Sequence, residues 1–293
     1  PSARAREIIG STRFQIVTSI AMYYDLDDPA EFATRVAEIL DEDGVWILEM
    51  SYLPLMLLQN SFDTICHEHL EYYSLATLEF IFRSTGLRVF RVELNDINGG
   101  SIRCYVSHAH SLNHGTSEDE ALLNKVRMKE FELALDTEKP FSAFRERISL
   151  LRDRTRLLLY ELRRAGKTIH VYGASTKGNV LLQWYGIDSL IVDMAADRNP
   201  LKDGAMTLGT DIPIRSEEAS RMARPDYYFV LPWHFKAEFL QREIETLKSG
   251  TTFIFPLPDL ELVGADKAEE ILNALHQSQH VDSRGTTLRF LSS

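Results

Sequence analysis

Short apolar runs that alternate with helical patterns limit what this chain can fold into more than any other feature of its sequence. The runs are rich in β-branched and aromatic residues, and helical patterns separate most of them. Such alternation predicts α/β folds with largely parallel sheets. The strand-like runs lie at residues 14–19, 45–50, 87–94, 101–108, 168–172, 190–194, 227–231 and 252–255. The first four and the last four form two blocks, which predict two α/β units, the second of them Rossmann-like.

The first block has the order strand, helix, strand, helix, hairpin. Its first helix is predicted to begin at residues 27–29, where two acids precede a proline, and to end at the Asp-Gly pair 43–44. The strand at 45–50 is predominantly apolar, which is typical of a strand covered on both faces. A second helix is expected at 75–84 and a hairpin turn at 95–100. This order is that of the second half of a doubly wound α/β sheet with an antiparallel edge.

Between the two blocks, residues 117–164 are highly charged and carry apolar residues at helical spacing. We interpret this stretch as a pair of helices that connects two domains. The expected limits are 1–115 for the first domain, 116–165 for the helical connector and 166–293 for the C-terminal domain.

Composition disfavours several classes of protein. The formal net charge of -11 and the pI of about 5.3 oppose binding to phosphate backbones and anionic membrane surfaces. The two cysteines, Cys66 and Cys104, are too few for a disulfide framework or a four-cysteine zinc site. No apolar run approaches the roughly 20 residues of a membrane span, and the sequence does not open with a secretory signal pattern. We therefore expect a cytoplasmic protein with no nucleic-acid or membrane partner.

One segment, residues 63–74, concentrates groups that can transfer protons. It contains His67, Glu68, His69, Tyr72 and Tyr73. Histidine has an unperturbed pKa near neutrality, so a positioned His-Glu pair can act as a general acid or base. A His-x-His pair in an extended segment could instead bind a metal, although no third ligand is evident nearby. A polar loop without a catalytic role is the third interpretation.

A glycine-punctuated turn at residues 173–179 lies between a predicted strand and a predicted helix. Backbone N–H groups in such a turn can approach an anion, and Lys177 adds a positive charge. The spacing fits neither the dinucleotide motif nor the P-loop. Asp193 and Asp197 come near the end of the next predicted strand, where an acid could meet a ribose hydroxyl. The turn either binds a phosphate or nucleotide or is a tight structural turn.

Two further motifs lie where ligands or turns are expected. Residues 98–101, Asn-Gly-Gly-Ser, form the hairpin tip, and the glycines allow positive φ, so a structural turn is the alternative to a ligand site. Arg103 lies on the returning strand. Residues 232–234, Pro-Trp-His, follow a strand of the second block at the carboxyl edge, where open α/β sheets place ligands.

Taken in order, these motifs resemble the S-adenosylmethionine-dependent C-methyltransferases of deoxysugar biosynthesis. Several separated motifs in the same order are more specific than any one of them, and the resemblance runs from about Phe14 to Val263. The matching segments are residues 63–75, 98–103, 173–179, 192–200, 209–214 and 232–234.

The resemblance implies an enzyme that transfers a methyl group from S-adenosylmethionine to a carbon beside the ketone of a nucleotide-linked keto-deoxysugar. It implies part of a class I methyltransferase domain at residues 1–115 and a Rossmann-like domain at 166–293. A base would remove the proton beside the carbonyl, because the resulting anion delocalises onto oxygen. The enolate carbon would then attack the methyl group.

Site residues follow from the same match. By the family's Glu-His motif, His69 is the expected base with Glu68 beside it, and Tyr72 is expected near the enolate oxygen, a place that Tyr73 or Asn98 could also take. The predicted substrate contacts are His67, Tyr73, Asn98, Gly99, Gly100, Ser101, Arg103, Ser175, Lys177, Asn179, Trp233 and His234. The predicted cofactor contacts are Ser19, Ile20, Met22 and Tyr23. No metal site is predicted.

The family also has parts without a counterpart in this sequence. These are a small N-terminal zinc-binding domain and the glycine-rich first strand-turn that holds the cofactor. Zinc is expected only in that N-terminal domain. We therefore expect either a truncated product or one half of a split enzyme, in which another polypeptide supplies the N-terminal half. The alternatives are a non-catalytic or partner-dependent nucleotide-sugar-binding protein and, disfavoured by the absent dinucleotide motif, a nicotinamide-dependent oxidoreductase.

Overall fold

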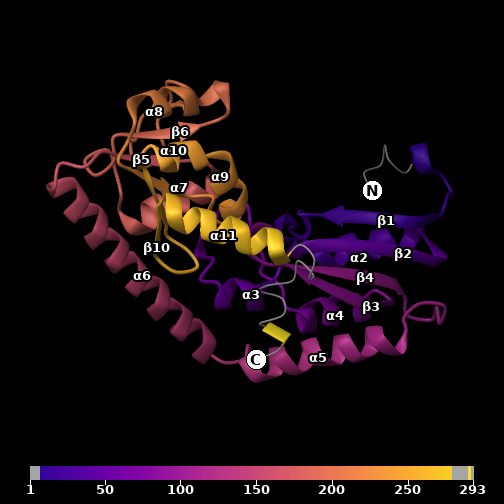
Figure 1. Ribbon diagram of the computed structural model, residues 1–293. Helices are drawn as coiled ribbons and strands as arrows, with labels where there is room; N and C mark the ends of the chain where they lie inside the picture. Colours follow the sequence, from indigo (N-terminus) through magenta and orange to yellow (C-terminus); the bar gives the residue numbers. More distant parts are fainter. Residues whose placement is uncertain (1–6, 279–289, 292–293) are drawn as a thin grey trace. The chain divides into compact units, whose positions relative to one another are not determined.

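The computed structural model describes residues 7–278 and 290–291, and the chain divides into two compact units that each combine a sheet with helices (Figure 1). Of the described residues, the first unit contains 7–56, 67–140 and 290–291, and the second contains 57–66 and 141–278. The chain therefore joins the second unit for ten residues before it returns to the first unit at His67.

A four-stranded sheet in the order β1-β2-β4-β3 forms the centre of the first unit. Its strands are β1 (Phe14–Ile20), β2 (Leu40–Ser51), β3 (Leu87–Asn95) and β4 (Ser101–His108). β1 and β2 are parallel, whereas β4 is antiparallel to both of its neighbours. The short 3-10 turn η3 (Ile97–Gly99) joins β3 to β4, so the predicted hairpin and antiparallel edge are confirmed.

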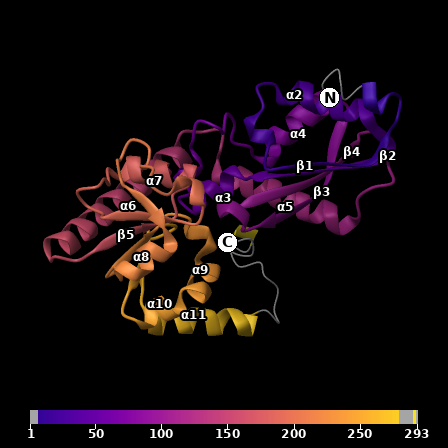
Figure 2. The same cartoon turned by 90° about the horizontal axis from the view of Figure 1, so that it is seen from above.

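The helices of this unit pack on one face of the sheet. They are α2 (Pro29–Ile39), α4 (Leu75–Ser84) and α5 (Ser117–Leu133), with the short α3 (Leu53–Leu58) where the chain leaves the unit. α2 and α4 lie side by side (Figure 2). Alternate residues of β2 and β4, such as Trp46, Leu48 and Cys104, belong to the same buried core as residues of these helices.

The opposite face of this sheet is charged. Arg103 of β4 donates to Glu49 of β2 at 2.5 Å and to Glu93 of β3 at 3.3 Å. Val45 and Ile47 share this face and stay partly exposed. The expectation that the strand at 45–50 is covered on both faces is therefore wrong for the residues that the structure describes.

Helix α2 ends at Ile39, before the Asp43-Gly44 pair that was predicted to close it. Leu40 already pairs with Phe14 of β1, and the register then shifts by several residues. A Cβ on Gly44 would lie 2.7 Å from the Phe14 carbonyl oxygen, which is too close for any other residue without movement. The glycine therefore serves a bulge in β2 and not a helix end.

The second unit contains a six-stranded sheet in the order β10-β9-β8-β5-β6-β7. Its strands are β5 (Ile169–Tyr172), β6 (Met194–Asp197), β7 (Ile214–Ser216), β8 (Tyr227–Val230), β9 (Thr252–Phe255) and β10 (Glu261–Val263). β10 is antiparallel to β9, and the other five strands are parallel. β5 comes first along the chain and lies in the middle. This is the predicted Rossmann-like order, and it creates a switch point between β5 and β8.

The helices of the second unit begin with a long one that precedes the sheet. They are α6 (Lys139–Arg164), α7 (Thr176–Tyr185), α8 (Glu217–Ala223), α9 (Lys236–Arg242), α10 (Ile244–Lys248) and α11 (Ala265–Ser278). α5 and α6 occupy the stretch interpreted as a connector, but they belong largely to different units. The domain limits 1–115, 116–165 and 166–293 stay a prediction. Within residues 7–278 and 290–291, no helix has the length and apolar character of a membrane span.

Two boundaries in the second unit differ from the prediction. β6 begins at Met194, because the apolar residues Ile191 and Val192 are buried in the turn before it. α7 begins at Thr176 and not at residue 180, because the side chain of Ser175 caps the helix by accepting from the Gly178 N–H at 3.0 Å.

A buried carboxylate ties α5 to the start of α4. Glu130 is 5% exposed and accepts hydrogen bonds from the Tyr52 hydroxyl at 2.6 Å, the Leu75 N–H at 2.5 Å and the Ala76 N–H at 2.9 Å. It therefore satisfies two of the backbone donors that a helix leaves unpaired at its N-terminus. Burial raises the pKa of Glu130, which these three bonds oppose.

Replacing Glu130 by alanine should lower the free energy of unfolding by about 2–4 kcal/mol, because one hydroxyl and two amides would lose a buried acceptor. Glu130→Gln keeps one acceptor oxygen and should cost less. Urea unfolding followed by tryptophan fluorescence measures both. Glu132→Ala, at an exposed position of the same helix, is the matched control. An equal effect of Glu130→Ala and Glu132→Ala would contradict the structural role.

Candidate functional site

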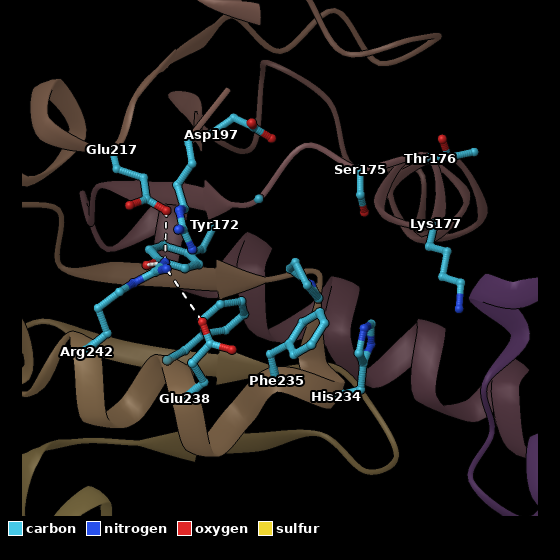
Figure 3. A pocket seen from close by; sticks show the side chains of 14 residues that line it. Tyr172, Ser175, Thr176, Lys177, Asp197, Glu217, His234, Phe235, Glu238 and Arg242 are labelled. Atoms are coloured by element: carbon cyan, nitrogen blue, oxygen red, sulfur yellow. Dashed lines mark hydrogen bonds and ion pairs between the residues drawn. The ribbon is translucent and has the colours of Figure 1, made fainter. Parts of the chain in front are cut away.

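A pocket of about 480 Å³ lies at the carboxyl ends of β5, β6 and β8 in the second unit (Figure 3). It is lined by Tyr172, Gly173, Ser175, Thr176, Lys177, Asp197, Arg198, Glu217, Pro232, His234, Phe235, Glu238, Phe239 and Arg242. Open α/β sheets bind their ligands in the crevice at such a switch point. The topology of this sheet therefore explains where the pocket forms.

The turns after β5 and β8 meet at the pocket. Gly173 has φ +87°, and a Cβ on it would lie 2.6 Å from the Pro232 ring. Ser175 then caps α7, so the N-terminus of that helix begins at the pocket wall. Backbone N–H groups and the positive end of the helix dipole suit an anion at this position.

Of the two acids that the sequence placed near a ribose, Asp197 lines the pocket. It also accepts from the Ala174 N–H at 2.8 Å and from Lys202 at 3.2 Å, so it braces the turn after β5. Asp193 lies at the other end of the strand, where it accepts from the Ile169 N–H at 3.0 Å and from Arg163 at 2.8 Å. The expectation that Asp193 lies at a strand end near the ligand is wrong, because β6 begins after it.

One end of the pocket is charged and aromatic. Arg242 pairs with Glu217 at 2.9 Å (Figure 3). It also donates to the Tyr172 hydroxyl, which in turn donates to Glu243 at 2.8 Å. Burial would raise the pKa of Glu243, but Arg221, at 2.5 Å, and the other donors lower it to about 2. This end offers a guanidinium held in place by fixed negative charges.

The other end contains Lys177 and His234. Nδ1 of His234 is buried and has no hydrogen-bond partner among the described residues. Burial, assisted by the charge of Lys177, lowers the pKa of His234 to about 4, so its imidazole is neutral near pH 7. The amino group of Lys177 points away from Arg242 and Glu217 (Figure 3).

Asp63 lies close to this end, although its place in the chain gives no sign of it. The residue is 1% exposed, and its Oδ2 accepts from the Trp233 indole N–H at 3.1 Å. Burial raises the pKa of Asp63 to about 6, although the charge of Lys177 and the bond from Trp233 act to lower it. Asp63 and Trp233 thus form a buried pair beside a buried lysine.

Several contacts hold residues 57–66 in the second unit. Asn60, with φ +55°, donates to the Pro258 carbonyl at 3.0 Å and accepts from Arg147 at 2.9 Å. Phe62 packs on the ring of Tyr185, with 5.5 Å between centroids. The segment that brings Asp63 to this unit is therefore fixed by polar and aromatic contacts along its length.

The candidate base His69 lies in the first unit. Its imidazole packs on the ring of Tyr24, with 4.2 Å between centroids. The Tyr24 carbonyl also accepts from the N–H groups of Leu70 at 2.9 Å and Glu71 at 3.2 Å. His69 is partly exposed, so a ring fixed from one side keeps access to solvent.

The other predicted groups of this segment differ in exposure. The side chain of His67 is 81% exposed and lies 4.0 Å from Glu68. Tyr72 is partly buried, whereas Tyr73 is in the core, where burial raises its pKa and its hydroxyl has no hydrogen-bond partner among the described residues. In the part of the chain that the structure describes, no group of three or more His, Cys, Asp and Glu side chains could hold a metal ion.

The residues predicted to contact S-adenosylmethionine follow β1 and fit that role only in part. Ser19 is buried and accepts from the Trp46 indole at 3.1 Å. Tyr23 is fully buried and donates to the Pro29 carbonyl at 2.8 Å, so its side chain is a core group. Ile20 is 53% exposed and Met22 partly buried, so these two side chains are able to contact a cofactor.

The hairpin tip is shaped by its backbone. Asn98, Gly99 and Gly100 all have positive φ, and the Gly100 carbonyl accepts from the Tyr52 N–H at 3.1 Å. The Ser101 hydroxyl donates to the Ile97 carbonyl at 2.9 Å. Arg103 is paired within the sheet, as described above. The structure thus accounts for these residues as a turn, and their substrate role stays a prediction.

Of the residues predicted from sequence, the pocket brings together Ser175, Lys177 and His234. Trp233 and Asn179 do not line it, because Trp233 turns to Asp63 and Asn179 lies further along α7. Asp197, at the end of β6, was also expected near a ligand and lines the pocket. The prediction missed Tyr172 at the end of β5 and the lining residues that come from α8 and α9. Phe235 directly follows the Pro-Trp-His motif and could have been included. Arg242 lies at the end of α9, and no motif points to it.

Two parts of the chain match known protein families. Residues 96–258 match the C-methyltransferase C-terminal domain, and residues 2–92 match a methyltransferase domain. The first match covers more than half of the chain, which therefore belongs to the C-methyltransferase family. As the sequence predicts, the first sheet is part of a class I methyltransferase fold and the second unit is Rossmann-like.

The chain is also similar to individual proteins. The C-methyltransferase NovU of Streptomyces niveus is 34% identical over 241 residues, which are 82% of this chain and 56% of that protein. The chain thus spans little more than half the length of this relative. A solved complex between the Haloferax volcanii Trm112 methyltransferase activator and a methyltransferase matches 34% of this chain and 56% of that chain, with 16% identity and a TM-score of 0.30. That likeness is too weak to bear on fold or function.

Asp63 and His234 should act on stability with opposite signs between about pH 4 and 6.5. The pKa of Asp63 is raised from 3.8 to about 6, so its contribution is present at low pH and is lost as pH rises through 6. The pKa of His234 is lowered from 6.5 to about 4, so its contribution is present above 6.5 and is lost as pH falls towards 4. Each difference corresponds to roughly 3 kcal/mol across that window.

Relative to the parent, Asp63→Asn should therefore make stability rise more steeply with pH, and His234→Gln should make it rise less steeply. Chemical unfolding at half-unit pH intervals measures both slopes. If both variants change the slope in the same direction, the opposite contributions of Asp63 and His234 to the pH dependence of stability are refuted.

Proposed function

We propose that the chain provides the catalytic base and the nucleotide-sugar site of an S-adenosylmethionine-dependent C-methyltransferase. Its substrate would be a nucleotide-linked keto-deoxysugar, methylated at a carbon beside the ketone. The observation that carries the proposal is the environment of His69, an imidazole fixed against Tyr24 and still partly exposed. Membership of the C-methyltransferase family supports the reaction class.

In this reaction His69 takes the proton from the carbon beside the carbonyl, and the charge delocalises onto the ketone oxygen. Tyr72, which is partly buried and lies three residues after His69, would donate a hydrogen bond to that oxygen. The Glu68 carboxylate would stabilise the positive charge of the protonated imidazole. When bound, S-adenosylmethionine supplies the electrophilic methyl group. Ile20 and Met22 are the side chains of this chain that would contact it.

The nucleotide would bind in the pocket of the second unit. The N-terminus of α7, with Ser175, Thr176 and Lys177, suits the phosphates, because backbone donors and a positive charge meet there. The rings of Phe235 and Phe239 offer apolar surface to the nucleobase. Asp197 lies at a strand end suited to a ribose hydroxyl.

The second candidate is a nucleotide-sugar-binding chain that is not catalytic alone. It is favoured by one observation, namely that the pocket is lined entirely by residues of the second unit. The N-terminal half of the catalytic site would then come from another polypeptide. Incubation with labelled cofactor and a panel of nucleotide-linked keto-sugars, with and without an N-terminal half taken from a relative, separates the two candidates.

His69→Gln should lower the rate of methyl transfer by about 10²-fold or more, because the base would be lost. The matched control is His110→Gln, an exposed histidine at the opposite end of β4 from the hairpin. Transfer of labelled methyl groups at saturating substrate, in an enzyme completed with the N-terminal half of a relative, measures the effect. If His69→Gln stays within about threefold of the parent, His69 is not the base.

A further inference from the structure

Asp63 differs from the other buried carboxylates of the chain. Its Oδ2 is bonded to Trp233, but its Oδ1 is buried and has no hydrogen-bond partner among the described residues. A buried acceptor without a partner is costly, so it calls for an explanation other than stability. The segment that carries Asp63 is held by the contacts of Asn60 and Phe62, which precede it, and by the hydrogen bond from Trp233 to Asp63 itself.

The charged and titratable groups around Asp63 come from three elements. Helix α7, which carries Lys177 and Tyr185, packs against the short 3-10 helix η2 (Phe62–Thr64), which carries Asp63. The side chains of Lys177 and Tyr185 interact electrostatically with the Asp63 carboxylate. Cys66, on the same segment, and His234, after β8, face Lys177. Lys177 thus supplies the positive charge of this cluster, and Asp63, when ionised, supplies the negative charge.

Lys177 also lines the pocket, so it links Asp63 to whatever the pocket binds. Burial lowers the pKa of Lys177, whereas the negative charge of Asp63 raises it. Without that carboxylate the pKa of Lys177 would be lower still, and its amino group would lose the attraction of a nearby negative charge.

We propose that Asp63 is a positioning residue for the pocket: its carboxylate keeps Lys177 charged and fixed, so that an anionic ligand gains the full benefit of the lysine only while Asp63 is ionised. This inference rests on the proposed nucleotide-sugar site, and the ligand class it names is a nucleoside diphosphate. Trp233 holds the carboxylate through its indole N–H, and the pocket therefore depends on a residue more than one hundred positions before Lys177.

The dependence on pH follows from this arrangement. Above about pH 6 Asp63 is ionised and supports Lys177, and below that pH it is neutral. Asp63→Asn mimics the neutral form at every pH. The parent and this variant should therefore bind alike at pH 5 and differ at pH 8.

The test is isothermal titration calorimetry of the full chain with UDP and with dTDP at pH 5 and pH 8. Asp63→Asn should raise Kd by about tenfold at pH 8 and by less than about twofold at pH 5. Comparing variants at one pH cancels the ligand's own protonation. Asp226→Asn, which removes a carboxylate that braces β5 and β8 away from the pocket, is the control and should leave both ratios near one.

Trp233→Phe keeps the aromatic packing and removes the N–H that lowers the pKa of Asp63, so the pH at which the parent gains affinity should move upward. This second variant keeps the proposal testable if Asp63→Asn folds poorly. An equal loss at pH 5 and pH 8, or no loss at pH 8, overturns the role of Asp63.

Lys177→Met separates this inference from the proposed function. If the parent binds neither nucleotide, or if Lys177→Met binds as well as the parent, the nucleotide site itself is refuted. If Lys177→Met weakens binding and Asp63→Asn does not, the site stands and only the positioning role of Asp63 fails.

Discussion

The hydrogen bond from Trp233 to Asp63 fixes a stretch of chain that both candidate sites share. Removing a carboxylate from water is unfavourable unless donors or a positive charge compensate. Here the indole N–H of Trp233 and the charge of Lys177 compensate only part of this unfavourable free energy. The pKa of Asp63 therefore stays above its usual value. Asp63 belongs to the second unit, yet His69 follows it by six residues and belongs to the first. The segment that looks continuous in sequence therefore serves two units.

The buried carboxylates among the described residues fall into two kinds. Glu49, Glu130 and Glu243 accept two or more hydrogen bonds each and tie elements that are distant in sequence. Both oxygens of each glutamate have a donor, so these hydrogen bonds account for their burial, although Tyr172, which donates to Glu243, lines the pocket. Asp63 has one such bond, a second oxygen without a partner, and a lysine that lines a pocket. This contrast is why Asp63, and none of the three glutamates, is assigned a role in ligand binding.

Local patterns predicted the elements of the fold well, because strand alternation and helix caps are local properties. The bounds of α4 and of the β3–β4 hairpin follow directly from such patterns. The errors came where a non-local contact decides the outcome. Leu40 joins a strand because Phe14 pairs with it, and the β6 strand starts late because Ile191 and Val192 are buried in a turn.

The candidate site was predictable only as far as motifs reach. Ser175, Lys177 and His234 lie in or next to recognisable turns, and they line the pocket. Arg242 lies on a helix surface, where its neighbours in sequence give no sign of a pocket. The contact of Asp63 with Trp233 joins residues 170 positions apart, and no periodicity in one sequence encodes such a pair.

Two glycines, Gly173 in the turn after β5 and Gly178 in the first turn of α7, also indicate the kind of ligand. A Cβ on Gly173 would meet the Pro232 ring, and a Cβ on Gly178 would lie 2.8 Å from the Leu231 side chain. Both glycines are therefore needed for packing between loops and between helix and strand. In dinucleotide-binding turns a further glycine lets the backbone approach a pyrophosphate, and this turn has Ser175 and Lys177 in that region instead. An anion would therefore meet the charge of Lys177 and a capped helix end, and not a glycine backbone. This arrangement disfavours a nicotinamide dinucleotide. It also makes affinity depend on the charge of Lys177, and through it on the ionisation of Asp63.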